Sequence, residues 1–139
     1  MSPSIPTPEQ EAVNLLLRSV PEFATERSSE ESYLSQDDND NSPYLVFGDF
    51  ARFIIDTIEH KRRDAMVETL IAKSFRVLSE IASSTDDRIR NLAEVGVFEV
   101  LTDSPEAILT AREYLSGNAS DTFERFVERW APKLKLSEQ

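Results

Sequence analysis

Carboxylates are the side chains of this sequence best suited to chemistry. They can act as general acids and bases, or they can attract and pair with the Lys and Arg side chains of a partner. Three of them lie close together in the polar stretch 35–43, one follows shortly after it, and two lie five residues apart further along the chain. The candidate residues are Asp37, Asp38, Asp40, Asp49, Glu94 and Glu99.

Glu94 and Glu99 are not expected to act as a pair if their segment is an α-helix. Five residues turn the chain by about 140° around the helix axis, so the two side chains diverge. Glu99 lies between Phe98 and Val100, which leaves two interpretations: a partly buried carboxyl with a raised pKa, or an ordinary residue at the rim, which we favour. With one histidine and three scattered glycines, no nucleophile–base pair and no phosphate-binding loop can be identified.

Two spacings are compatible with a metal, and both lack a required ligand. Asp56 and His60 share a helix face, but no third ligand has a suitable spacing. A second set resembles a calcium loop, yet Pro43 occupies the position where such loops need glycine, and the last ligand is Asp rather than a bidentate Glu. This second set is Asp38, Asp40, Ser42 and Asp49. The chain contains no cysteine, and we predict no metal and no cofactor.

Aromatic residues near the C-terminus allow a ligand pocket or a core stripe. Tyr114, Phe123, Phe126 and Trp130 are the residues concerned. The last three fall at helical spacing, and large aromatic side chains in such a pattern usually belong to the core. We therefore favour the core.

The charge of the chain indicates what kind of partner it could bind. Its 139 residues include 26 acidic and 15 basic side chains, for a formal net charge of −11. This charge disfavours nucleic acids and anionic membranes, because phosphate binding needs a basic surface. It favours rapid encounter with a basic protein. The sequence has no apolar run long enough to span a bilayer and no secretory signal at its start, so we predict a cytoplasmic protein.

The apolar residues repeat at helical spacing nearly throughout, which predicts an all-α protein, a compact bundle of about six helices. We expect helices over 8–20, 21–34, 44–60, 64–83, 86–103, 105–115 and from Ser120 or Asp121 to about residue 131. The sequence VGVFEV could alternate as a strand, but it lies inside a longer helical pattern. Gly96 lies on the apolar side of its helix, where the missing side chain would let a neighbouring helix come close.

The predicted helices form one domain over residues 8–131, which contains the acidic loop 35–43. Residues 1–7 are predicted to be disordered and residues 132–139 to be a flexible tail. The helices over 64–83 and 86–103 are joined by a short polar turn. This arrangement is typical of a helical hairpin of the HEAT or armadillo type, although no second copy occurs at a fixed period.

Four segments together resemble a known family. They are LLLRSVPEF at 15–23, PYLVFGDFARFI at 43–54, RNLAEVGVFEVL at 90–101 and AREYLSGNASDTFERFVERW at 111–130. Over residues 13–131 the chain resembles small bacterial all-helical domains of unknown function, a kind also found among immunity proteins. The resemblance implies an all-α domain and a toxin as partner. It contains no catalytic motif and assigns no active residue.

Three functional hypotheses follow. The first, which we favour, is a non-enzymatic interaction domain whose acidic surface binds a basic protein, in its specific form an immunity protein that neutralises a basic toxin. The second is a small-ligand-binding or enzymatic domain that uses Asp49, Glu94 and Glu99. The third is a scaffold or dimerisation module with an exposed apolar helix face.

Overall fold

The protein is an assembly of α-helices, as the sequence predicts. The computed structural model describes residues 7–31 and 42–130, and within these ranges it contains helices and no strands. The segment VGVFEV is helical, so the strand alternative is wrong. The helices are α1 (Pro8–Ser19), α2 (Pro21–Glu31), α3 (Pro43–His60), α4 (Ala65–Ala82), α5 (Asp87–Ala93), α6 (Glu99–Leu101), α7 (Pro105–Tyr114) and α8 (Gly117–Trp130), with a π turn, Glu94–Phe98, between α5 and α6.

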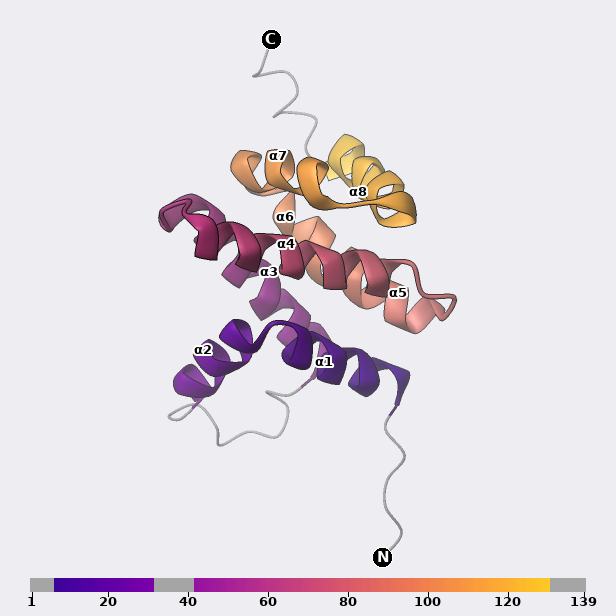
Figure 1. Cartoon of the computed structure of the whole chain (residues 1–139). Coiled ribbons are helices and arrows are strands. Elements are labelled where there is room, and N and C mark those ends of the chain that lie inside the picture. The colour runs from indigo at the N-terminus through magenta and orange to yellow at the C-terminus, as the bar shows by residue number, and fades with distance from the viewer. Residues whose placement is uncertain (1–6, 32–41, 131–139) are drawn as a thin grey trace, which may run out of the picture.

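Three groups of helices pack on one another (Figure 1). The continuous helical segment from α5 to α6 lies with α3 and α4 in the middle. Helix α1 packs on this middle group from one side and is followed by α2, whereas α7 and α8 cover the opposite side. Helix α4 and the α5–α6 segment run back along each other after the short turn 83–86, which confirms the predicted helical hairpin.

Side-chain caps fix several helix starts where the sequence predicts them. The Thr7 hydroxyl accepts a hydrogen bond from the Gln10 amide (3.1 Å) at the start of α1. The carboxylate of Asp64 does the same for the Val67 amide (2.9 Å) at the start of α4. Such caps satisfy amide groups that the first turn of a helix leaves without partners. Ser42 immediately precedes α3, but its side chain makes no capping hydrogen bond.

Helix α8 begins earlier than the sequence predicts. We expected Ser120 or Asp121 to cap it, but the helix starts at Gly117. Gly117 has a φ of 58°, a left-handed conformation that glycine adopts without steric cost. The chain can therefore turn from α7 into α8 within two residues, and the predicted capping residues lie inside the helix.

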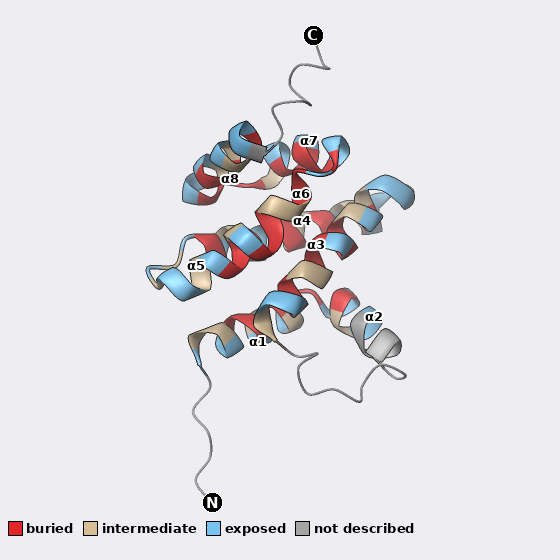
Figure 2. Cartoon of the chain, turned by 180° about the vertical axis from the view of Figure 1, so that it is seen from behind, coloured by how far each residue is buried: buried red, intermediate tan, exposed pale blue. Residues whose placement is uncertain are grey.

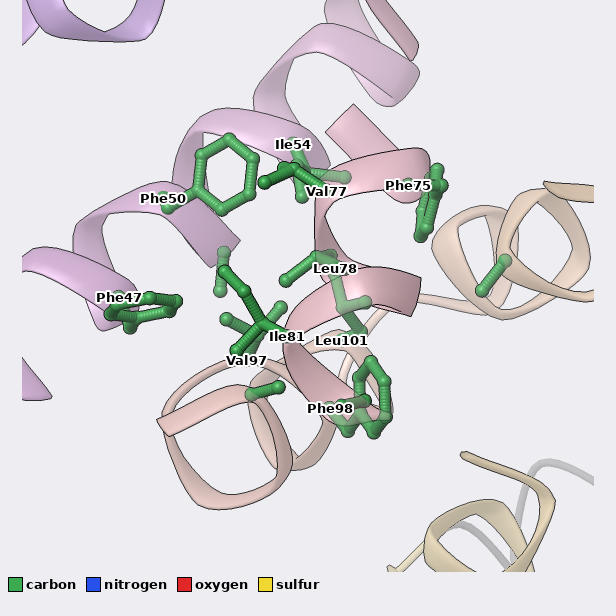
Figure 3. Packing of buried hydrophobic residues seen from close by; sticks show 14 of the residues in the cluster. Phe47, Phe50, Ile54, Phe75, Val77, Leu78, Ile81, Val97, Phe98 and Leu101 are labelled. Carbon is green, nitrogen blue, oxygen red and sulfur yellow. The ribbon is translucent and has the colours of Figure 1, made fainter. Parts of the chain in front are cut away.

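One apolar core runs through all three groups of helices, with buried residues facing inward in Figure 2. Its largest fully buried side chains include Phe47, Phe50, Phe75, Phe98 and Phe123. Figure 3 shows the first four of these phenylalanines around residues of α4 such as Leu78 and Ile81. Long-range polar contacts add to this packing, since Lys73 on α4 donates to Glu22 on α2 (2.8 Å).

None of the helices in the described ranges has the length and apolar character needed to cross a bilayer. Residues 1–6 of the predicted disordered start, residues 35–41 of the acidic loop and the predicted tail 132–139 lie outside the described residues.

Candidate functional site

The predicted site residues fall in two groups. Asp37, Asp38 and Asp40 lie outside the described residues. The other three occupy known positions: Asp49 lies in α3, Glu94 is the first residue of the π turn, and Glu99 is the first residue of α6. The structure therefore places half of the predicted site on two neighbouring helical segments, α3 and the α5–α6 segment, which pack directly against each other.

The π turn changes the relation between Glu94 and Glu99. In an α-helix each amide bonds to the carbonyl four residues earlier, but here the Glu99 amide donates to the Glu94 carbonyl, five residues back. One extra residue within the turn means that less rotation separates the two side chains than the α-helical value of about 140°. The predicted divergence is thus too large, and both carboxylates are half-buried at the surface of the bundle.

Gly96 explains how α3 can approach the π turn closely. A Cβ atom built on Gly96 would lie 2.9 Å from the Cβ of Phe47, well inside the usual separation of carbon atoms, about 3.5–4.0 Å. Only glycine fits at this contact. The close approach expected from the sequence is confirmed, with α3 as the neighbouring helix.

Helix α3 and the π turn also carry charged and apolar side chains that are exposed. Asp49 is ion-paired with Arg52, and both side chains are substantially exposed. Tyr44, Leu45 and Val95 are 45%, 48% and 46% exposed. Exposed apolar side chains of this size occur at interaction surfaces when they form a contiguous patch.

Glu94 lines an open groove that contains neither Asp49 nor Glu99. The groove has a volume of about 390 Å³ and lies between the α4–α5 turn and α8. On its α8 wall, the guanidinium of Arg125 donates a hydrogen bond to the Thr122 hydroxyl (3.1 Å). The full lining is Ala82, Ser83, Ser84, Thr85, Arg90, Glu94, Asn118, Asp121, Thr122 and Arg125. The three carboxylates of the enzymatic hypothesis are therefore not gathered in this cavity.

A pair of side chains with shifted pKa values lies elsewhere, between α4 and α7. The Tyr114 hydroxyl donates a hydrogen bond to Glu68 (2.5 Å), and Arg63 forms an ion pair with the same carboxylate. The hydrogen bond from Tyr114, helped by the charge of Arg63, holds the pKa of Glu68 below its ordinary value. The same bond raises the pKa of Tyr114. Because all three side chains already bind one another, we interpret Arg63, Glu68 and Tyr114 as a structural contact that links α4 to α7, and we call it the tie.

The tie was not predicted from the sequence, because Glu68 and Tyr114 are 46 residues apart. Tyr114 also stacks on Phe75, with ring centroids 6.2 Å apart. Phe123 is buried and packs against Phe98. These aromatic residues therefore belong to the core, which is the interpretation that we favoured. The side chain of Trp130 lies outside the described part of the structure.

The metal hypotheses gain no geometric support from the described residues. No group of three or more His, Asp or Glu side chains within residues 7–31 and 42–130 is placed to hold a metal ion. His60 and its neighbour Glu59 lie 3.8 Å apart. Two of the four residues with calcium-like spacing, Asp38 and Asp40, lie outside these ranges.

Fold and surface together define an all-helical domain with an open polar groove and an acidic exterior. The chain belongs to the family described as a domain of unknown function (DUF7674), whose match covers residues 13–129. It matches no curated protein and no solved structure.

Proposed function

We propose that this chain is a non-enzymatic interaction domain that binds a basic protein through an acidic surface around the start of α3. One observation carries the proposal. The exposed side chains of Tyr44 and Leu45 follow directly after the most acidic part of the sequence, which has seven acids and one arginine between Glu22 and Asp40.

This combination fits the physics of protein recognition. Acidic side chains accelerate the encounter with a basic partner. Exposed aromatic residues supply much of the binding energy once the surfaces meet, with tyrosine among the most frequent contributors. Asp37, Asp38, Asp40 and Asp49 would then pair with Lys or Arg residues of the partner. In its more specific form, which rests on the resemblance to immunity proteins, the partner is a basic toxin that the domain neutralises.

A small-ligand role is the second candidate, and the groove lined by Glu94 supports it. Glu94 and Asp121 line the groove together with Arg90 and Arg125, so it presents both signs of charge. A ligand held there would meet Glu94 alone of the three carboxylates proposed for catalysis. The groove thus favours binding over a reaction that needs paired carboxylates.

The test is to isolate a partner with the full chain as bait, in the cells that produce the protein, and to measure the affinity of the purified pair. We expect a Lys/Arg-rich partner whose affinity falls as the salt concentration rises, mainly through a slower association rate. The variant Asp37→Asn/Asp38→Asn/Asp40→Asn should bind more weakly.

A matched control neutralises three exposed acids on α4 and α7, outside the start of α3, in Glu80→Gln/Glu106→Gln/Glu113→Gln. It should retain most of the affinity. Equal affinities for both triple variants, or an affinity that salt does not change, would contradict the proposal. If the partner is a toxin, co-expression of the wild-type chain should restore growth more fully than the Asn variant does.

A further inference from the structure

The groove between the α4–α5 turn and α8 carries charge on both of its helical sides. Arg90 and Glu94 are four residues apart on the α5 side, and Asp121 and Arg125 are four residues apart on α8. Residues at this spacing share one face of a helix, so each side presents one acid and one guanidinium group to the groove. Its volume of about 390 Å³ lies in the range of small-molecule sites, roughly 300–1,000 Å³.

Arg90 is held by its own helix and by the turn that precedes it. Its guanidinium donates a hydrogen bond to the Ser84 carbonyl oxygen (3.0 Å) and forms an ion pair with Asp87. Asp87 is not part of the groove lining. Arg90 therefore helps to shape the wall, and its charge is already balanced by a carboxylate outside the groove.

Glu94 and Arg125 are not balanced in this way. Within residues 7–31 and 42–130, neither side chain forms an ion pair, although both line the same groove. The guanidinium of Arg125 donates one hydrogen bond, to the Thr122 hydroxyl (3.1 Å), which leaves most of its five N–H donors for a ligand. Glu94 is half-buried, so solvent screens its charge less than the charge of an exposed acid.

We infer that the groove binds a free α-amino acid, whose ammonium group pairs with Glu94 and whose carboxylate pairs with Arg125. Such a ligand has no net charge, which matches a described lining with two acids and two guanidinium groups. Among the described residues, the rest of the lining has hydroxyl or amide side chains except for Ala82, so the side chain of the ligand should be polar and uncharged. This inference deepens the small-ligand candidate and is independent of binding to a basic protein.

The expected affinity is modest because the ligand is small and the groove is open. A guanidinium group can hold a carboxylate through two parallel hydrogen bonds, and bonds between charged groups are about twice as strong as neutral ones. For a ligand of about ten non-hydrogen atoms, we expect a dissociation constant of about 0.1–1 mM.

NMR titration of the full, isotopically labelled chain tests the inference. The first probe is a mixture of L-serine, L-threonine, L-asparagine and L-glutamine, each at about 10 mM, which is well above the expected dissociation constant. We expect the largest shifts on the amides of residues 90, 94, 122 and 125. The tightest binder is then compared with its N-acetyl derivative, which lacks the ammonium charge, and with its carboxamide, which lacks the carboxylate. Each derivative should bind at least about tenfold more weakly.

Two variants connect each charge of the ligand to one residue. In Glu94→Gln, the N-acetyl derivative should bind about as well as the free amino acid, and in Arg125→Gln the carboxamide should do so, because the lost partner no longer distinguishes them. A merely structural role of either residue would weaken all probes alike. The matched controls Glu99→Gln and Arg129→Gln change a half-buried glutamate and an exposed arginine of α8 outside the groove, and both should bind as the wild-type chain does.

The possible failures are distinguishable. If a derivative binds as tightly as the free amino acid, or if a variant keeps the wild-type preference, the amino-acid inference is overturned and the groove remains a candidate small-ligand site. If the mixture causes no shifts in the groove, the result overturns the inference and counts against the small-ligand candidate as well. Neither outcome bears on the affinity for a basic protein, which is measured separately.

Discussion

Replacing Gly96 with alanine tests the packing of α3 against the π turn. In an ordinary helix this change stabilises a protein by about 1 kcal/mol, because alanine is the better helix former. Here the new Cβ atom would lie 2.9 Å from the Cβ of Phe47. Since Phe47 Cβ is attached directly to the backbone, side-chain rotation cannot relieve the overlap and α3 must move.

Gly48 provides the matched comparison. A Cβ on Gly48 would meet only the end of the Arg52 side chain, at 3.7 Å, so Gly48→Ala should stabilise the protein by about 1 kcal/mol. Overpacking of a tight core costs about 1–3 kcal/mol. Gly96→Ala should therefore be less stable than Gly48→Ala by about 1–3 kcal/mol, because the gain in helix propensity is common to both variants.

Urea unfolding followed by far-UV circular dichroism measures this difference in free energy, and thermal unfolding measures it as a difference in melting temperature. At about 4 °C per kcal/mol for a chain of this size, the melting temperatures should separate by about 4–12 °C. Adding Phe47→Leu should not rescue Gly96→Ala, because leucine keeps the Cβ atom. The reasoning is refuted if both alanine variants are equally stabilised, or if Phe47→Leu restores the stability of Gly96→Ala.

Further substitutions have effects that follow from individual contacts. Phe98→Ala removes a fully buried ring from the core and should cost about 3–5 kcal/mol; a thermal unfolding curve that barely moves would contradict the assigned packing. Asp64→Ala removes a cap that bonds an amide of α4 and should cost about 1 kcal/mol, whereas Ser42→Ala should cost almost nothing in the same denaturant titration, since Ser42 makes no capping bond. Because the pKa of Glu68 is lowered in the folded state, its contribution to stability is present above pH 4.5 and is lost on acidification. Tyr114→Phe should raise the pKa of Glu68 toward 4.5 and lessen the acid sensitivity of folding, and an NMR titration that shows the same pKa in both proteins would disprove this link.

The helices could be predicted from the sequence because capping and apolar spacing depend on residues that are close together in the chain. Thr7 and Asp64 cap helices within three residues of their own positions. The helical spacing of apolar residues identified the buried faces of α3 and α4, and it also placed Gly96 on the packed side of its helix. Each of these inferences needed only the residues of a single helix.

The π turn could not be predicted in this way, because nothing in the sequence 94–98 forbids an ordinary α-helix. Phe98 packs edge-on against Phe123 of α8 (5.5 Å between ring centroids), while Gly96 of the same short segment meets Phe47 of α3. We infer that the extra residue in the turn lets both contacts form together. That requirement belongs to the tertiary structure, and it also determines the directions of Glu94 and Glu99.

The start of α8 was missed for a different reason. A Gly-Asn pair usually ends a helix, and α7 does end just before it. The same glycine then begins α8, because its left-handed φ of 58° redirects the chain at once. Residue types alone do not show this backbone conformation, so the start of α8 at Gly117 could not be predicted from them.

The position of α1 has a consequence for the newly made chain. Helix α1 lies near the N-terminus, yet it packs on α4 and α5, and the α5–α6 segment that completes the middle group ends at Leu101. About 80 residues must be added after α1 before these partners are all present, which takes roughly 4 to 16 seconds at ordinary rates of translation. During that time Leu16 and Val20, both fully buried in the finished protein, lack part of the helical surface that buries them.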